Sequence, residues 1–339
     1  MSHLVVAPDK FRGTASATDV ADAVVRAAIG IGWTGDAVPM SDGGEGLLDA
    51  VGGQTRTTTV PGPLGAPVQA EWRLLADTGA GTTAVIEMAQ AGGRALLAHP
   101  AGDDPMRAST AGVGQLLLVA AQARVARIVI GCGGSATTDG GWGAVDAVGG
   151  PDALAGIDLV VACDVTTRFG DAAALFGPQK GATPEQVVEL SARLATLATR
   201  YRRDFGVDVV DLPGAGAAGG LAGGLVVLGA RIEPGFDLVA RLTRLGERMH
   251  GADLVVTGEG HLDPPSFSGK VPGGVLELVA GSCPVLCVVG GADPELLAQP
   301  PPGLEVVSLT QRFGAARARR DTVELVAQVV ADALPRFCP

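Results

Sequence analysis

The fold class is decided by one stretch of sequence, LVVAPDKFRGTASATDVADAVVRAAI, which spans residues 4–29. Its apolar start at residues 4–7 predicts a buried β-strand, and the loop behind this strand begins at Pro8. Ser16 is a suitable helix N-cap, and the apolar residues that follow it at helical spacing predict a helix to about Ile29. A strand, a loop and a helix in this order are typical of a parallel sheet covered by helices.

The same alternation of apolar strands and amphipathic helices continues along the chain. Further strands are expected at residues 37–40, 128–130, 159–162, 254–256, 284–289 and 304–308, and helices at 110–121, 184–203 and from about 321. Between Thr55 and Met88, alternating threonine and valine with Gly-Pro punctuation predict a few antiparallel strands instead. We therefore expect an α/β protein in which a discontinuous domain (1–58 plus 248–339) carries an inserted second α/β domain (59–247), with a cleft between them.

The composition excludes several classes of protein. Apolar residues make up 47% of the 339 residues, which is enough for packed cores and rules out global disorder. The net charge of −11 disfavours nucleic acid as a partner, because phosphate backbones are bound by basic patches. The sequence shows neither a signal-peptide pattern nor a run of about 20 apolar residues, so we expect a cytoplasmic protein without a membrane partner.

Acidic residues beside glycines or hydroxyl residues follow five of the expected strands. These loops contain residues 9–13, 41–46, 133–141, Asp164 and 257–260. In an open parallel sheet, ligands bind beyond the carboxyl ends of the strands. One such loop would be an ordinary turn, but five loops of the same chemistry indicate a binding site.

These loops contain the groups that phosphoryl transfer needs. The reaction requires backbone N–H groups around phosphate oxygens, carboxylates for Mg²⁺, and an acid that orients the accepting hydroxyl. The glycine-rich loop 133–141 can supply the first of these. The candidates for the other two roles are Asp42, Asp139, Asp164 and Glu259, and the basic candidates for a carboxylate or a phosphate are Lys10, Arg12, Lys180 and Lys270.

Two common nucleotide-binding motifs receive no support. The P-loop pattern GxxxxGK[ST] is missing, since Val271 follows Lys270. A GxGxxG pattern occurs at residues 214–219, but the acidic residue about 20 positions on, Asp237, lies in a turn-like stretch and not at a strand end. We interpret these glycines as close packing of a helix against the sheet or against a nucleotide phosphate.

Seven motifs in a fixed order resemble the bacterial glycerate kinase family, type I group. They are APDKFRG (7–13), SDGGEG (41–46), IEMAQA (86–91), GGSATTDGG (133–141), LFGPQKGA (175–182), GAGAAGG (214–220) and TGEGHLD (257–263). The resemblance covers nearly the whole chain. It implies ATP- and Mg²⁺-dependent phosphorylation of D-glycerate in a cleft between two α/β domains, the main one flavodoxin-like.

The chain departs from the family pattern at two loops. Residues 167–169 read Thr-Arg-Phe where the family has Asn-Pro-Leu, and a few residues are missing behind them. His261 stands where the family has arginine, and the stretch after Asp263 has prolines in place of a glutamine. An arginine is permanently charged, whereas a histidine titrates near neutrality, so the substrate can differ from the family's while the reaction type is kept.

We predict the following roles for individual residues. Catalytic residues are Asp42, Asp164 and Asp139; substrate-binding residues are Asp9, Lys10, Arg12, His261 and Asp263; nucleotide- or phosphate-binding residues are Gly133, Gly134, Ser135, Gly214, Gly216, Lys180 and Lys270; and metal ligands are Asp42, Asp164 and Glu259.

The expected function is an ATP-dependent kinase of D-glycerate, giving 2-phosphoglycerate, or of a closely related small hydroxy acid. The sequence leaves open whether the 2- or the 3-hydroxyl reacts and whether the protein is a monomer or a homodimer. Three alternatives remain. They are an enzyme of the same fold with other phosphoryl or acyl-phosphate chemistry, a catalytically silent binder of small acids or nucleotides, and an NAD-dependent oxidoreductase that uses the Gly214 loop.

Overall fold

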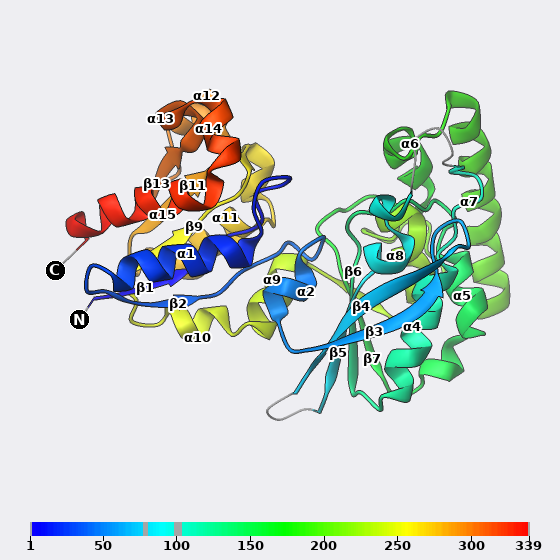
Figure 1. Ribbon diagram of the computed structural model, residues 1–339. Coiled ribbons are helices and arrows are strands. Elements are labelled where there is room, and N and C mark those ends of the chain that lie inside the picture. The colour runs from blue at the N-terminus through cyan, green and yellow to red at the C-terminus, as the bar shows by residue number, and fades with distance from the viewer. Residues whose placement is uncertain (1, 77–80, 98–103, 338–339) are drawn as a thin grey trace. The chain divides into compact units, whose positions relative to one another are not determined.

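The computed structural model describes residues 2–76, 81–97 and 104–337. The chain divides into two compact units, each built around its own sheet (Figure 1). The first unit contains Met1–Asp42, Asp49–Val51 and Gly235–Pro339, and the second contains Gly43–Leu48 and Gly52–Pro234. The α/β class is therefore confirmed. The predicted domain boundaries (1–58 plus 248–339, and 59–247) stay a prediction.

The sheet of the first unit is entirely parallel. Its strands are β1 (His3–Val6), β2 (Thr34–Ala37), β9 (Leu254–Thr257), β11 (Val285–Val289) and β13 (Leu304–Ser308). They lie in the order β13-β11-β9-β1-β2, and each neighbouring pair is parallel. Renumbered within this unit, the order is 2-1-3-4-5, which is the flavodoxin-like arrangement that the resemblance implied.

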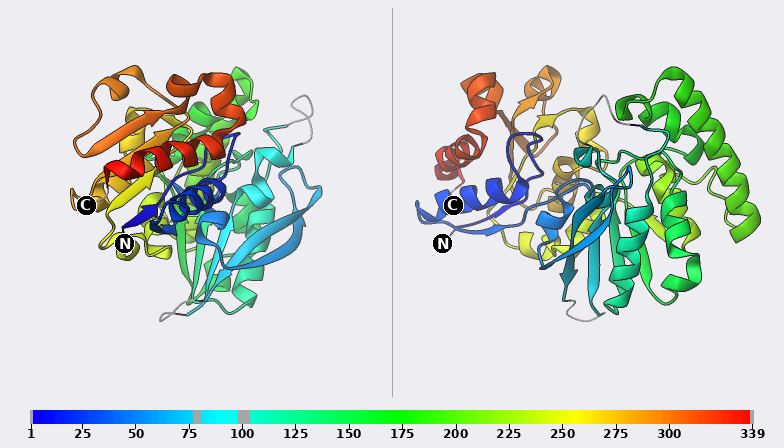
Figure 2. Two further views of the ribbon diagram at one scale, coloured as in Figure 1. Left: turned by 60° about the vertical axis from the view of Figure 1, so that its left-hand side comes forward. Right: turned by 45° about the vertical axis from the view of Figure 1, so that its right-hand side comes forward.

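Two long helices cover one face of this parallel sheet. Helices α1 (Ala17–Ile29) and α15 (Thr322–Ala333) lie side by side and share a buried apolar cluster with alternate strand residues (Figure 2). The hydroxyl of Ser16 accepts a hydrogen bond from the Asp19 N–H at 3.0 Å, so the predicted N-cap is confirmed. Helix α11 (Val271–Val279) contacts strands β9 and β11. The remaining elements of this unit are α9 (Gly235–Leu242), α10 (Leu245–Met249), β10 (His261–Leu262), β12 (Gly291–Ala292), α12 (Pro294–Ala298), α13 (Leu309–Phe313) and α14 (Ala315–Arg320).

The sheet of the second unit is mixed. Its strands follow one another in chain order: β3 (Gln54–Pro61), β4 (Pro67–Leu75), β5 (Thr83–Glu87), β6 (Arg127–Gly131), β7 (Asp158–Ala162) and β8 (Arg231–Glu233). The pairs β3–β4 and β4–β5 are antiparallel, and the pairs from β5 to β8 are parallel. This confirms the antiparallel strands predicted between Thr55 and Met88.

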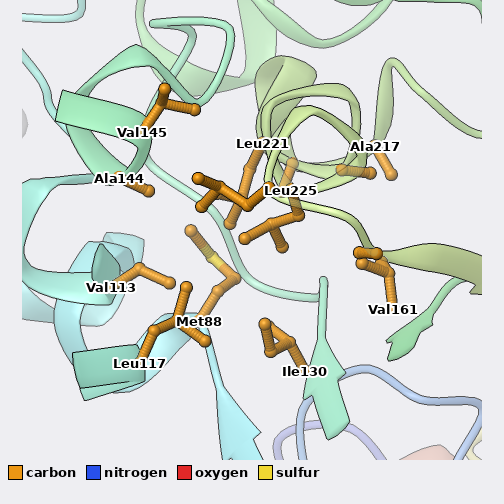
Figure 3. Packing of buried hydrophobic residues seen from close by; sticks show 14 of the residues in the cluster. Met88, Val113, Leu117, Ile130, Ala144, Val145, Val161, Ala217, Leu221 and Leu225 are labelled. Carbon is orange, nitrogen blue, oxygen red and sulfur yellow. The ribbon is translucent and has the colours of Figure 1, made fainter. Parts of the chain in front are cut away.

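The helices of the second unit close a large apolar core over this sheet. They are α3 (Ala89–Gly92), α4 (Ala111–Gln122), α5 (Trp142–Val148), α6 (Ala172–Phe176), α7 (Pro184–Phe205) and α8 (Ala217–Val227), while α2 (Leu47–Val51) has residues in both units. Figure 3 shows how Met88, Ile130 and Leu225, which come from different elements, meet in this core. Thr183 caps α7 through a reciprocal hydrogen-bonded box with Gln186, and Gly206 ends it in the left-handed conformation.

The GxGxxG segment packs tightly against other backbone in this core. Ala218, Gly219 and Gly220 have left-handed dihedral angles, so α8 is kinked near its start. A Cβ atom at Gly219 would overlap the carbonyl oxygen of Thr137, and one at Gly216 would overlap the carbonyl oxygen of Arg168. These glycines therefore allow close backbone approach, which agrees with the packing interpretation of the motif.

We predict that Gly219→Ala destabilises the protein by about 3 kcal/mol, because it adds both a steric clash and backbone strain. The control is Gly229→Ala. Gly229 also has a positive φ, of 97°, but a Cβ there would meet nothing within 4 Å, so it should cost only about 1 kcal/mol. Urea denaturation followed by circular dichroism measures both losses. Equal losses for the two variants would contradict the packing role.

Candidate active site

A cavity of about 440 Å³ opens at the carboxyl edge of the parallel sheet in the first unit. Its wall is made by the loops that follow β1, β2, β9 and β11, together with residues of α13, α14 and α15. Strands β1 and β9 are neighbours. The chain continues from β1 to β2 on one side and from β9 to β11 on the other, so the loops behind β1 and β9 lead away from each other. Such a topological switch point is where open α/β sheets bind their ligands.

The loop behind β1 places a buried carboxylate next to a lysine. Lys10 Nζ lies 3.5 Å from Asp9 Oδ1 and 3.9 Å from Asp42 Oδ1. The backbone N–H of Lys10 also donates to Asp9 Oδ1 at 2.7 Å. Burial raises the pKa of Asp9 to about 6; the positive charge of Lys10 opposes this rise, and the negative charge of Asp42 adds to it. Lys10 therefore holds two carboxylates together at one edge of the cavity.

Glu259, which follows β9, lines the cavity and has a buried carboxyl group. Glu259 is only 7% exposed, and its Oε1 atom is buried without a hydrogen-bond partner among the residues that the structure describes. Burial raises the pKa of Glu259 to about 7, against the opposing effects of a hydrogen bond from Ser266 and the charge of Lys270. A buried cavity carboxylate that titrates near neutrality has the properties of a general base.

The loop behind Glu259 is held in place by its own hydrogen bonds. Asp263 Oδ1 accepts from the Ser266 N–H at 3.0 Å and from the Ser266 hydroxyl at 2.8 Å, which caps a short turn of 3₁₀-helix at Pro264–Phe267. Lys270 Nζ lies 3.5 Å from Asp263 Oδ1. His261 is exposed, and its Nε2 lies 3.1 Å from Asp293 Oδ1. The Pro264-Pro265 departure from the family pattern thus forms the start of a capped turn.

Eight residues predicted to form the site line this one cavity. They are Asp9, Lys10, Arg12, Asp42, Glu259, His261, Asp263 and Lys270. The cavity is also lined by four residues that were not predicted from the sequence: Thr14, Thr310, Arg319 and Thr322. Arg319 belongs to the segment Arg317-Ala-Arg-Arg near the C-terminus, where the sequence pattern gives no sign that one arginine differs from its neighbours. The individual roles of all these residues stay predictions.

The glycine-rich loop 133–141 belongs to the second unit and is built around a buried lysine. Lys180 Nζ donates to the carbonyl oxygen of Thr137 at 2.6 Å and to the hydroxyl of Ser135 at 3.4 Å. The same Ser135 hydroxyl accepts from the Thr137 N–H at 3.1 Å. Burial lowers the pKa of Lys180 to about 8, although the charge of Asp139 works against this. Lys180 thus fixes the backbone of the loop that contains Gly133 and Gly134.

Asp139 is fully engaged in holding this loop. Its Oδ2 accepts from the N–H and the hydroxyl of Thr110, both at 2.8 Å, and from the Gly143 N–H at 3.2 Å. Its Oδ1 accepts from the Gly141 N–H at 3.1 Å. Burial nevertheless raises the pKa of this carboxyl. Four donors on one buried carboxylate favour a structural role over the predicted catalytic role.

The three predicted metal ligands are distributed over both units. Asp42 and Glu259 belong to the first unit, and Asp164, which follows β7, belongs to the second. In the part of the chain that the structure describes, no three His, Cys, Asp or Glu side chains gather as a group that could hold a metal ion. Magnesium in kinases needs only one or two carboxylates when substrate phosphates complete its shell, so a carboxylate such as Asp42 fits that requirement.

Within residues 2–76, 81–97 and 104–337, no helix is long and apolar enough to cross a membrane.

Comparisons with known proteins agree on one family. The model of the "Glycerate kinase family" matches residues 4–152 and 150–334. A glycerate 2-kinase from Escherichia coli strain K12 is 40% identical over 311 residues, which cover 80% of this chain and 80% of the relative. A glycerate kinase from Halalkalibacterium halodurans is 38% identical over 329 residues, 86% of each chain. A crystal structure from Salmonella typhimurium LT2, assigned by name as a glycerate kinase 2, aligns with a TM-score of 0.81 and 33% identity over 98% of both chains.

We predict that Lys180→Met changes the pH dependence of folding stability. The folded-state pKa of Lys180 is lowered to about 8 from an ordinary 10.5, so its stabilising contribution is complete above pH 10.5 and is lost as the pH falls through 8. Each pH unit between these values changes the free energy of unfolding by about 1.4 kcal/mol. The free energy of unfolding of the wild type, relative to that of the variant, should therefore rise by about 3 kcal/mol across the interval.

Urea denaturation of both proteins between pH 7.5 and 10.5 measures this change. Arg202→Met is the control, because Arg202 is exposed on α7 and a guanidinium stays charged throughout. If the stabilities of the wild type and Lys180→Met run parallel across this range, Lys180 is not a buried, pKa-shifted lysine.

Proposed function

The chain belongs to the glycerate kinase family, and from this premise we propose that it transfers the γ-phosphate of ATP to the 2-hydroxyl group of D-glycerate. The observation in this structure that supports the proposal best is the cavity at the switch point of the parallel sheet. It brings a buried carboxylate with an unpartnered oxygen, Glu259, together with basic side chains suited to an anionic substrate.

The charges of the cavity suit a small hydroxy acid. Four carboxyl residues, Asp9, Asp42, Glu259 and Asp263, and four cations, Lys10, Arg12, Lys270 and Arg319, line it. The formal charges therefore cancel, although the chain as a whole carries −11. The lysine and arginine side chains of the cavity can therefore attract an anionic substrate, although the net negative charge of the protein repels it. Burial also favours the neutral forms of two of the four carboxyl groups, which strengthens this effect.

Glu259 is the residue that we assign to the proton of the accepting hydroxyl. The hydroxyl donates a hydrogen bond to the Glu259 carboxylate, and the proton passes to this group as the hydroxyl oxygen forms its bond to the γ-phosphorus. The bond between the γ-phosphorus and the oxygen that bridges it to the β-phosphorus breaks, and ADP leaves with that oxygen. The product is phosphoglycerate, and no covalent enzyme intermediate is formed.

Mg²⁺ belongs to the proposal as the partner of ATP. When bound, it would neutralise charge on the phosphate oxygens. Asp42 is the candidate carboxylate for holding it, beside Lys10, whose Nζ lies 3.9 Å away. We also propose that loop 133–141, whose backbone is fixed by Lys180, binds phosphate of the nucleotide, with Gly133, Gly134 and Ser135 as the contact residues.

One alternative is supported by a specific observation. His261 takes the place of the family's arginine, and its imidazole lies beside the Asp293 carboxylate at 3.1 Å. A substrate other than glycerate, related in size and charge, would follow if that arginine contacts the substrate. The oxidoreductase alternative is weakened by the packing of Gly216 and Gly219 against backbone carbonyls. A monomeric or homodimeric state and a cytoplasmic location stay predictions.

The purified protein, given ATP, Mg²⁺ and D-glycerate, should release ADP at roughly 1–100 turnovers per second, as other kinases do. Phosphorus and carbon NMR of the product should show phosphate on the 2-hydroxyl. A folded protein that binds ATP but leaves D-glycerate unchanged would contradict the proposed function, and a panel of small hydroxy acids would then test the alternative substrate.

Replacing Glu259 by glutamine should lower kcat by a factor of about 10² to 10⁴, because the variant has no base for the hydroxyl proton. The base is active only when ionised, so wild-type kcat/KM should rise with pH up to about 7 and then level off, in line with the raised pKa of Glu259. Glu259→Gln should lose this acidic limb.

Glu277→Gln is the matched control, because Glu277 is exposed on α11 and does not line the cavity. It should keep both the wild-type rate and the wild-type pH profile. A Glu259→Gln enzyme with an unchanged rate, or with the acidic limb intact, would exclude Glu259 as the base.

A further inference from the structure

The four cations of the cavity are of two kinds. Lys10 is paired with Asp9 and Asp42, and Lys270 is paired with Asp263. The side chains of Arg12 and Arg319 make no ion pair or hydrogen bond with any residue in the described ranges 2–76, 81–97 and 104–337. These two guanidinium groups are therefore available for a ligand.

Arg319 differs in this respect from the other arginines of its helix. Arg320 Nε lies 2.8 Å from Asp321 Oδ1, and Arg317 Nε lies 3.6 Å from Asp321 Oδ2. Neither Arg317 nor Arg320 lines the cavity, whereas Arg319 does. Asp321 thus neutralises the two arginines that point elsewhere and leaves the third for the cavity.

The wall that carries Arg319 is firmly anchored. Its neighbour Ala318 is 3% exposed and belongs to the apolar core beneath α1 and α15. The hydroxyl of Thr322, which is also buried, donates to the Ala318 carbonyl oxygen at 2.7 Å. Ala318 and Thr322 line the cavity on either side of Arg319 in sequence. The backbone of Arg319 is thereby fixed at the cavity edge, which lowers the entropic cost of placing its side chain on a ligand.

The remaining charges of the cavity identify the chemistry of that ligand. Arg12 and Arg319 line the same cavity as Glu259, whereas the two lysines of the cavity are paired with Asp9, Asp42 and Asp263. A guanidinium presents two parallel N–H donors, which match the two oxygens of a carboxylate. The two unpaired guanidiniums are therefore suited to the carboxylate of a small acid.

We propose that Arg319, together with Arg12, binds the carboxylate of the hydroxy-acid substrate and selects acids over neutral polyols. This inference rests on the proposed function, since it assigns a role in the same cavity. The contact forms when the substrate binds and persists in the transition state. It therefore acts on KM and not on kcat.

The test is steady-state kinetics of Arg319→Leu, with Arg317→Leu and Arg320→Leu as matched controls on the same helix. For Arg319→Leu we expect KM for D-glycerate to rise about 10- to 100-fold, the value of a charged bidentate contact. The KM for ATP and kcat should stay within about twofold of the wild type, and Arg319→Lys should recover only part of the loss. Both control variants should match the wild type.

A neutral analogue separates carboxylate binding from a structural effect. With glyceramide, which has the hydroxyl groups but no carboxylate, Arg319→Leu and the wild type should have the same kcat/KM. An unchanged KM for D-glycerate in Arg319→Leu would overturn the proposal. So would an equal loss in the control variants, or an equal loss with glyceramide.

Calorimetry with D-glycerate alone distinguishes this inference from the proposed function. Binding by the wild type and loss of binding in Arg319→Leu would support the carboxylate site even if no phosphate transfer were seen. If the wild type neither binds nor phosphorylates D-glycerate, both the inference and the proposed function are wrong.

Discussion

The parallel pairing of β1 with both β2 and β9 is the constraint on which the candidate site depends. Because the loop behind β1 leads to one side and the loop behind β9 to the other, no connection crosses the space between them. Asp9, Lys10 and Arg12 stand on one loop, and Glu259 and Asp263 on the other. Residues about 250 positions apart in the sequence thus share one cavity because their strands are neighbours.

The cavity combines groups that neutralise one another with groups that do not. Pairing with lysine offsets the cost of holding Asp9, Asp42 and Asp263 near one another. Glu259 lacks such a partner for Oε1, and its pKa rises to about 7 as a result of burial. A site in which every charge is already paired gains little from new charged contacts with a ligand. The Glu259 carboxyl group and the two unpaired arginines, which all line the cavity, are the places where we expect a ligand to make new contacts.

Much of the fold could be predicted because its signals are local. The apolar run at residues 4–7, the Ser16 cap and the proline at the start of α7 each predict an element from neighbouring residues alone. The antiparallel strands were equally visible in the alternation between Thr55 and Met88. The order of the strands could not be predicted from such local signals, because it depends on which strands pair with each other across long stretches of sequence. Only the family resemblance implied it.

The site was predictable only where a residue follows a strand directly. Asp9 and Glu259, which line the cavity, were predicted by that rule. Asp139 was predicted by it too; its carboxylate accepts four hydrogen bonds from Thr110, Gly141 and Gly143, and its catalytic role stays a prediction. Arg319 was missed, because its difference from Arg317 and Arg320 lies in the placement of Asp321 and of the cavity. Neither feature can be read from the sequence of that helix.

A crystal structure of the protein with D-glycerate would test the central claim most directly, namely that the cavity of the first unit binds the hydroxy acid. We predict the substrate carboxylate within hydrogen-bond distance of Arg12 or Arg319, and a substrate hydroxyl on the Glu259 carboxylate. D-glycerate bound at loop 133–141 instead, with the cavity between Asp9 and Glu259 filled only by solvent, would contradict it.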